Sequence, residues 1–223
     1  MNNFDDLGYD SAISAILTDE PNRRRILRNT FRDSDGQLWY DKIPISVNQH
    51  QRTIYPQLNF GNLLRGNNDF AVKPSQISDA ISTASEILHI DLEVGRLVGL
   101  HIAGTPQTED EPTTYFPYIR TSPRYKLWRD GDSLYVNNRK ANIKSDITRI
   151  FYPKNIIDEK TGEIIYRLRM EDRASRHLKT HLKLGGMFPL LLLTDLQDQR
   201  LFEASINWWK NDFQRFMLPV ITQ

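Results

Sequence analysis

The sequence contains no cysteine, which excludes a disulfide framework, a thiolate metal site and a cysteine nucleophile. Long apolar runs are also missing: the longest is Met187–Leu193, and Pro189 interrupts it. A membrane-spanning helix needs about 20 apolar residues in succession, so we expect no membrane partner. The first six residues include two aspartates and no lysine or arginine, whereas a secretory signal peptide begins with positive charge. We therefore expect a cytoplasmic protein.

Familiar catalytic motifs are absent as well. There is no Gly-x-x-x-x-Gly-Lys loop and no Gly-x-Gly-x-x-Gly turn, either of which would surround a phosphate with backbone N–H groups. Gly-x-Ser-x-Gly and His-Glu-x-x-His do not occur either, which argues against serine hydrolases and zinc proteases of the common kinds. His177 and His181 are four residues apart and could share a metal ion, but no third ligand lies near them in the sequence.

The charge of the chain is unevenly distributed. Although the net charge is only +1, residues 139–183 contain twelve Lys or Arg and six Asp or Glu, a local charge of +6. The remainder has seventeen basic and twenty-two acidic residues, which gives −5. A basic region on a slightly acidic molecule suits a polyanionic partner such as DNA. A solvated charged surface would produce the same composition.

Hydrophobic periodicity predicts an α+β fold, with a largely antiparallel sheet and helices packed on one face. The clearest helix covers residues 75–89, where Ser75 can cap the first turn and apolar residues recur at helical spacing. A closing amphipathic helix covers residues 202–216, and a basic helix covers residues 173–184, before Gly185. The expected strands are residues 39–47, 54–58, 96–103, 125–129, 133–137, 147–152, and 163–170 or slightly beyond.

We expect one domain over residues 1–223. The pattern predicts clear elements over the core part, residues 74–217. Over residues 1–73 alternation is weak and turn-forming residues are scattered, so few elements can be predicted there. Three polar residues on separate expected strands are the best candidates for chemistry. His101 lies between apolar neighbours, Tyr152 ends its strand with Lys154 two residues later, and Glu171 lies between arginines. A phenol, a lysine, a carboxylate and an imidazole together suit nucleophilic or metal-assisted chemistry.

Five short motifs occur in a characteristic order between residues 57 and 216. The first is a Gly-Asn-Asn element that ends a seven-residue segment, and the second is a helix followed by a short strand. A tyrosine with a lysine two residues later, an Arg-x-Glu-x-Arg strand and a tryptophan-containing helix follow. In this sequence they are residues 62–68, residues 75–102, Tyr152 with Lys154, Arg169–Arg173, and residues 207–213.

This order resembles the replication initiators of filamentous phages and the related phage and plasmid replication proteins of Bacteroidetes. The resemblance implies rolling-circle replication initiation in a bacterial cytoplasm, by nicking and joining single-stranded DNA. Tyr152 would be the nucleophile and Lys154 its catalytic neighbour, while Glu171 and His101 would bind Mn²⁺ or Mg²⁺. Single-stranded or origin DNA is the implied partner, together with host replication proteins. The implied DNA-binding residues are Arg169, Arg173, Arg176, Lys179, Asn67 and Asn68.

Two departures from the family pattern leave alternatives open. His101 occupies the position of a metal-binding aspartate, and Mg²⁺ prefers oxygen ligands. Pro153 follows the tyrosine where relatives often have an aspartate, and the two-histidine motif of another large class of strand-nicking enzymes is missing. A DNA-binding relative without nicking activity is therefore a second interpretation, and a phage structural or interaction protein is a third. Residues 115–129 combine aromatic and basic side chains that could stack bases, or they could pack as an ordinary hairpin.

Overall fold

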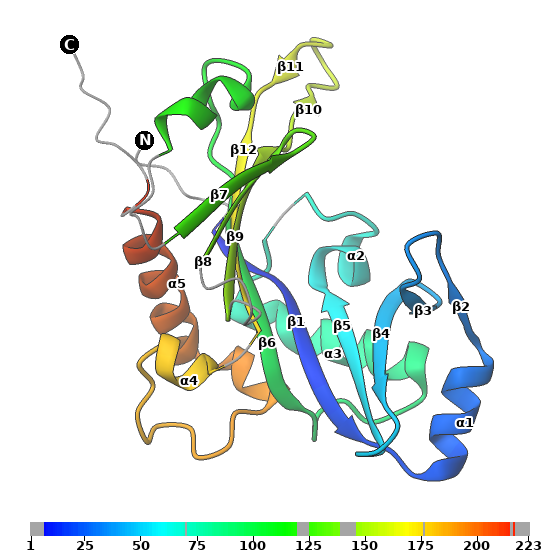
Figure 1. Ribbon diagram of the computed structural model, residues 1–223. Coiled ribbons are helices and arrows are strands. Elements are labelled where there is room, and N and C mark those ends of the chain that lie inside the picture. Colours follow the sequence, from blue (N-terminus) through cyan, green and yellow to red (C-terminus); the bar gives the residue numbers. More distant parts are fainter. Residues whose placement is uncertain are drawn as a thin grey trace.

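A ten-stranded antiparallel sheet forms the centre of the computed structural model (Figure 1), which describes residues 7–69, 71–119, 125–138, 146–175, 177–214 and 216. The strands of this sheet are β1 (Gly8–Leu17), β2 (Thr30–Arg32), β3 (Leu38–Tyr40), β4 (Ile43–Asn48), β5 (Thr53–Asn59), β6 (Arg96–Gly104), β7 (Tyr125–Asp130), β8 (Ser133–Asn138), β9 (Ile147–Pro153) and β12 (Leu168–Ala174). Their order across the sheet is β2-β3-β4-β5-β1-β6-β12-β9-β8-β7. Two short strands, β10 (Ile156–Ile157) and β11 (Ile164–Ile165), pair with each other.

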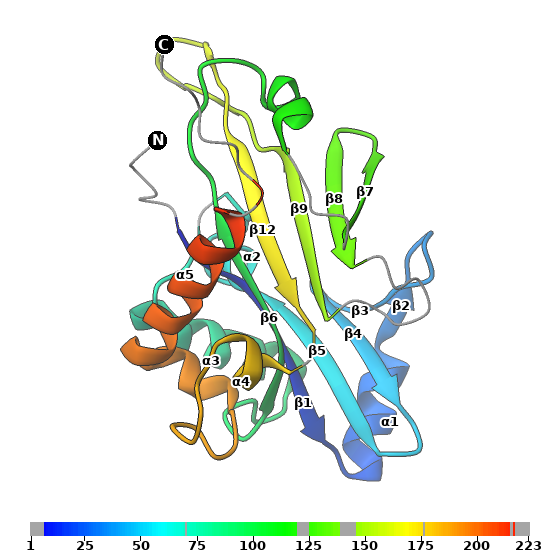
Figure 2. The ribbon, with the colours of Figure 1, turned by 60° about the vertical axis from the view of Figure 1, so that its left-hand side comes forward.

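The α-helices are α1 (Glu20–Arg28), α2 (Phe60–Arg65), α3 (Ile77–Leu88), α4 (Leu178–His181) and α5 (Gln199–Phe213). Three 3₁₀ segments add η1 (Pro74–Gln76), η2 (Pro112–Tyr118) and η3 (Leu193–Gln197). Helices α3, α4 and α5 lie on the same side of the sheet (Figure 2), and α1 lies at the opposite end of the molecule from β10 and β11 (Figure 1). The expected α+β class with a largely antiparallel sheet is therefore confirmed.

Strand alternation separates the two faces of the sheet. On the face covered by α5, Tyr9 packs edge-on against Phe202, with ring centroids 5.2 Å apart, and Phe151 packs in the same way against Phe213. Because successive side chains of a strand point to opposite faces, the neighbours of Phe151 point away from α5. Tyr152 therefore points to the second face. Glu171 points to that face as well, because its neighbour Met170 is the cross-strand partner of Phe151.

The helix expected at residues 173–184 is wrong over most of its length. Strand β12 continues to Ala174, because Arg173 pairs with His101 on one side and with Thr148 on the other. Only Leu178–His181 is α-helical, and His177 and Lys183 on either side have φ angles of +52° and +55°. Such angles end a right-handed helix. Long-range strand pairing therefore overrides the local helical pattern here.

Other expected elements agree more closely with the structure. The expected helices 75–89 and 202–216 correspond to α3 and α5, and the expected strands 125–129 and 133–137 correspond to β7 and β8. The expected strand 163–170 divides: Ile164–Ile165 forms β11, and the main-sheet strand begins at Leu168. Residues 1–73, which the sequence left hardly readable, supply β1 to β5 of the same sheet. Among the described residues, the helices are too short or too polar to cross a bilayer.

Candidate functional site

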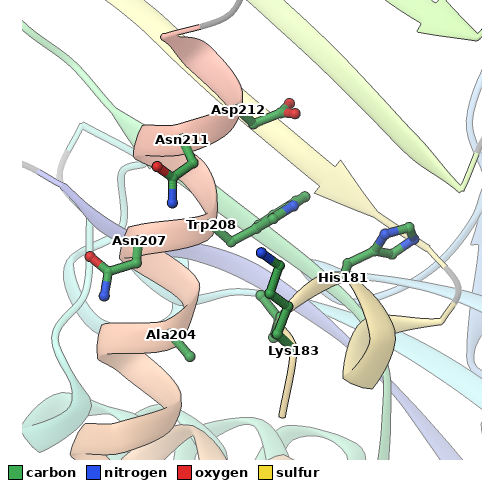
Figure 3. Close-up of a pocket in the computed structure, with 8 residues that line it drawn as sticks. His181, Lys183, Ala204, Asn207, Trp208, Asn211 and Asp212 are labelled. Carbon is green, nitrogen blue, oxygen red and sulfur yellow. The ribbon is translucent and has the colours of Figure 1, made fainter. Parts of the chain in front are cut away.

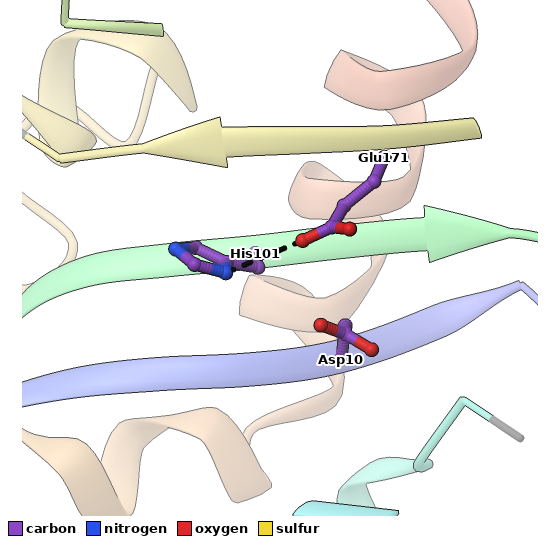
Figure 4. A group of neighbouring side chains, drawn as sticks. All are labelled: Asp10, His101 and Glu171. Carbon is purple, nitrogen blue, oxygen red and sulfur yellow. Dashed lines mark ion pairs between the residues drawn. The ribbon is translucent and has the colours of Figure 1, made fainter. Parts of the chain in front are cut away.

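Three adjacent strands bring Asp10, His101 and Glu171 together (Figure 4). Strands β1, β6 and β12 are consecutive in the sheet, and one possible ligand atom from each residue lies within 4.8 Å of the others. All three residues are buried, with 4%, 6% and 1% of their surfaces exposed. Among the described residues, this is the one group of three or more histidine and acidic side chains that could hold a metal ion. We call it the DHE cluster.

A β-bulge directs Asp10 into the DHE cluster. Tyr9 pairs with Ile102 and Ser11 pairs with His101, so Asp10 is an extra residue on β1 between two consecutive partners on β6. A bulge of this kind changes the direction of a side chain without ending the strand, and bulges are frequent beside active sites. Sequence reasoning missed Asp10, because the bulge breaks the period-two alternation that would have marked residues 8–17 as a strand.

The imidazole of His101 is held by two contacts to the same nitrogen. Its Nδ1 lies 2.7 Å from the hydroxyl of Ser11 and 3.3 Å from Oε1 of Glu171. Since Ser11 is the cross-strand partner of His101, the first contact follows directly from the strand register. The ring is therefore oriented toward the carboxylate from a fixed position on β6, as the dashed line in Figure 4 marks.

Two arginines of β12 form ion pairs with the carboxylates of the cluster. Arg173 donates from Nε to Oε1 of Glu171 at 2.8 Å and from a terminal nitrogen to Oε2 at 3.3 Å. Arg169, which is fully buried, pairs with Asp10 and donates to the hydroxyl of Thr105 at 3.1 Å. Both arginines were predicted to contact DNA. The structure places both of them at the DHE cluster, and the side chain of Arg173 is 43% exposed.

The two carboxylates of the cluster have opposite pKa shifts. Burial by itself would raise the pKa of Glu171, but the hydrogen bond with His101 and the charge of Arg173 outweigh it and hold that pKa far below its usual range. Burial raises the pKa of Asp10, and the negative charge of Glu171 raises it further. A pair of acids whose pKa values are driven apart is typical of functional sites.

Tyr152 lies beside the cluster at the end of β9. Its hydroxyl donates a hydrogen bond to Oε2 of Glu171 at 3.2 Å, and its side chain is half-buried. Burial and then the charge of Glu171 raise the pKa of Tyr152 above its ordinary value, so the resting phenol is protonated. Glu171 thus contacts both the predicted nucleophile and the other predicted metal ligand.

Lys154 and the loop after α2 meet near the same strand end. The ammonium of Lys154 lies 3.4 Å from Oδ1 of Asp69, and its backbone N–H donates to the carbonyl of Arg167 at 2.7 Å. Asn67 and Asn68 directly precede Asp69, so this ion pair connects their loop to the end of β9. Asn67 is exposed, whereas the side-chain oxygen of Asn68 is buried without a hydrogen-bond partner.

One predicted DNA-binding residue, Lys179, does not lie at the cluster. Lys179 belongs to α4, on the face of the sheet that the helices cover (Figure 2), and it donates to the carbonyl of Pro189 at 3.2 Å. Of the basic helix to which it was assigned, only the short helix α4 is formed. Arg176 lies outside the described residues.

A separate pocket of about 170 Å³ opens between α4 and α5 (Figure 3). Its lining includes His181, Trp208 and Asp212. Asp212 pairs with Arg149, whose side chain points from β9 toward α5 and so away from Tyr152. The pocket therefore lies on the opposite side of the sheet from the DHE cluster, and the suggested histidine pair at residues 177 and 181 plays no part in that cluster.

No known protein family, curated protein or solved structure matches this chain. The resemblance to rolling-circle initiators therefore stays a prediction from the sequence motifs.

Proposed function

We propose that the protein initiates rolling-circle replication by nicking and rejoining single-stranded DNA through Tyr152. The observation that carries this proposal is the hydrogen bond from the Tyr152 hydroxyl to Glu171, a member of the buried DHE cluster. This contact joins a phenol, which can act as a nucleophile, to side chains that can bind a metal ion. Such an arrangement suits phosphoryl transfer.

The donor set of the cluster fits a divalent cation. Asp10, His101 and Glu171 would supply two carboxylate oxygens and one imidazole nitrogen. This mixed set suits Mn²⁺ better than Mg²⁺, which prefers oxygen alone. When bound, the ion would polarise the phosphoryl oxygens and offset the negative charge that develops on them.

The residues of the chain would perform the transfer itself. The phenolic oxygen of Tyr152 forms a bond to phosphorus, and the bond from phosphorus to the 3′ oxygen breaks. The products are a 5′-phosphotyrosine and a 3′-hydroxyl that a host polymerase can extend. The phenolic proton passes to water by way of Glu171 Oε2, which already accepts its hydrogen bond, and the 3′ oxygen takes up a proton from water. Arg173, whose side chain is 43% exposed, would contact a DNA phosphate.

One observation favours a second candidate, a DNA-binding relative without nicking activity. Arg173 donates to both oxygens of Glu171. The guanidinium of Arg173 therefore already neutralises the carboxylate to which a metal ion would have to bind. Nicking requires this pair to open or to share the carboxylate with the ion. Binding of DNA through Arg173 and its surroundings requires neither.

Incubation with labelled, origin-like single-stranded DNA in Mn²⁺ or Mg²⁺ tests the proposal. Nicking through Tyr152 predicts a covalent protein–DNA adduct with the wild type and none with Tyr152→Phe. Salt-sensitive binding without an adduct in either metal would reject nicking and support the second candidate. Absence of DNA binding at moderate salt would reject both.

A further inference from the structure

We propose that Trp128 and Tyr135 form a stacking platform for DNA bases next to the nicking site, an inference that rests on the proposed function. The two rings belong to the β7–β8 hairpin and stack on each other, with centroids 5.1 Å apart and planes inclined by 10°. Both side chains are partly exposed. Aromatic faces of this kind bind the bases of single-stranded DNA without preference for sequence.

The strand register places this pair on the same face of the sheet as Tyr152. Trp128 is opposite Tyr135, and Tyr135 is opposite Ile150 of β9. Residues directly opposite each other in an antiparallel sheet point to the same face, as do residues two apart on one strand. Ile150 and Tyr152 are two apart, so the aromatic pair and the proposed nucleophile share the face that α5 does not cover.

The alternate residues of the hairpin support this assignment. Val136, which is fully buried, pairs with Leu127, and Tyr125 packs edge-on against Phe216 with centroids 5.2 Å apart. The guanidinium of Arg149 lies over both of these rings, 5.0 Å from Tyr125 and 4.8 Å from Phe216. These residues form the packed side of the hairpin, so Trp128 and Tyr135 lie on its other side.

The distance from the pair to the nucleophile is short. Tyr135 and Tyr152 are diagonal neighbours across β8 and β9, and such Cα atoms are about 7–8 Å apart. Strand β7 is one edge of the main sheet, so Trp128 is on the outermost strand. A strand cut at Tyr152 can therefore extend along this face and place the bases beside the scissile phosphate on the aromatic pair.

The charges around the pair suit a nucleic-acid backbone on one side. Lys126 is exposed, and it occupies the same face as Trp128, two residues earlier on β7. Asp130, two residues later, is also exposed and lies at the hairpin turn. The polarity of this edge predicts that the phosphates pass the Lys126 side of the pair and avoid the turn.

The platform is tested by measuring the binding of a short labelled oligothymidylate without metal ions. The protein carries Tyr152→Phe, so that it cannot cut the DNA. Trp128→Ala should raise the Kd about tenfold, because the loss of one base–aromatic stacking contact weakens binding by a factor of that order. Trp128→Phe keeps an aromatic face and should restore most of the affinity. Leu127→Ala is the matched control: it alters the same strand on the opposite face, and its Kd should equal that of the parent.

The outcomes separate this inference from the function on which it rests. If the parent binds the oligonucleotide and Trp128→Ala binds equally well, the platform is rejected while DNA binding stands. If the parent does not bind, the proposed function fails and the platform fails with it. Equal losses in Trp128→Ala and Leu127→Ala would show a general weakening of the hairpin and would also reject the platform. Circular dichroism and melting temperatures of each variant establish that the hairpin is folded.

Discussion

The hydroxyl of Tyr152 lies 3.2 Å from Oε2 of Glu171, although the two residues are not directly opposite each other on their strands. The partner of Tyr152 on β12 is Arg169, and the partner of Glu171 on β9 is Ile150. The contact is therefore diagonal, and it depends on both side chains pointing to the same face. A shift of one residue in this register would direct one of them toward α5. The strand register thus determines the candidate site.

Divalent metal should stabilise the folded protein through the DHE cluster. At an Mn²⁺ concentration about 100 times its Kd, the free energy of unfolding should rise by about 2.7 kcal/mol. His101→Ala removes one of the three donors, so it should need more Mn²⁺ for the same rise in melting temperature. His181→Ala, on the opposite side of the sheet, is the control and should respond as the wild type does. Equal responses of all three proteins would contradict the assignment of His101 as a ligand.

The ion pair between Asp10 and Arg169 should be important for stability. Both side chains are buried, at 5% and 0% exposure, and removing one member leaves a buried charge that is no longer compensated. Asp10→Ala should lower the free energy of unfolding by about 3–5 kcal/mol, as measured by urea denaturation. Glu20→Ala breaks the ion pairs that a 40% exposed carboxylate forms with Arg23 and Arg24, and it should cost far less. Similar losses for the two variants would show that the buried pair has no special role.

Any side chain at position 104 should destabilise the protein, because Gly104 lies against Trp209 of α5. A Cβ atom at this position would lie 2.9 Å and 3.0 Å from two carbons of the indole ring, which also donates to the carbonyl of Met170 at 3.3 Å. Gly104→Ala should therefore cost about 1–3 kcal/mol through overpacking. Gly186 provides the control: a Cβ atom there would meet nothing within 4 Å, so Gly186→Ala should be nearly neutral. Thermal unfolding of both variants measures the difference.

Asp198 should contribute a pH-dependent part of the stability at the start of α5. Hydrogen bonding from Arg200 and from backbone N–H groups lowers the pKa of Asp198 to about 2. Because the folded-state pKa lies below the unfolded value of about 3.9, this contribution is complete above that value and is lost as the pH falls toward 2. The melting temperature of Asp198→Asn should therefore be lower than that of the wild type at pH 5, and the difference should shrink toward pH 2. A difference that is constant with pH would contradict this assignment.

The sequence predicts the fold class, and it identifies three of the four central residues of the site. His101 stands out between apolar neighbours, Tyr152 at a strand end with Lys154 two residues later, and Glu171 between arginines. Asp10 does not stand out, because the bulge on β1 interrupts the period-two alternation of its strand. Arg173 was assigned to a helix from local composition, and only its pairing with His101 and Thr148, far away in sequence, makes it part of a strand. Bulges and long-range pairing are properties of the folded sheet, which local periodicity does not encode.

Nicking through Tyr152 is most directly tested by locating the DNA on the protein after reaction. Single-stranded DNA that contains the cleavage site is incubated with the protein and Mn²⁺, the adduct is digested with nuclease and protease, and the peptides are analysed by mass spectrometry. We predict a nucleotide attached to the peptide that contains Tyr152, at that tyrosine. A nucleotide on any other residue, or cleaved DNA with no modified peptide, would contradict the proposed mechanism.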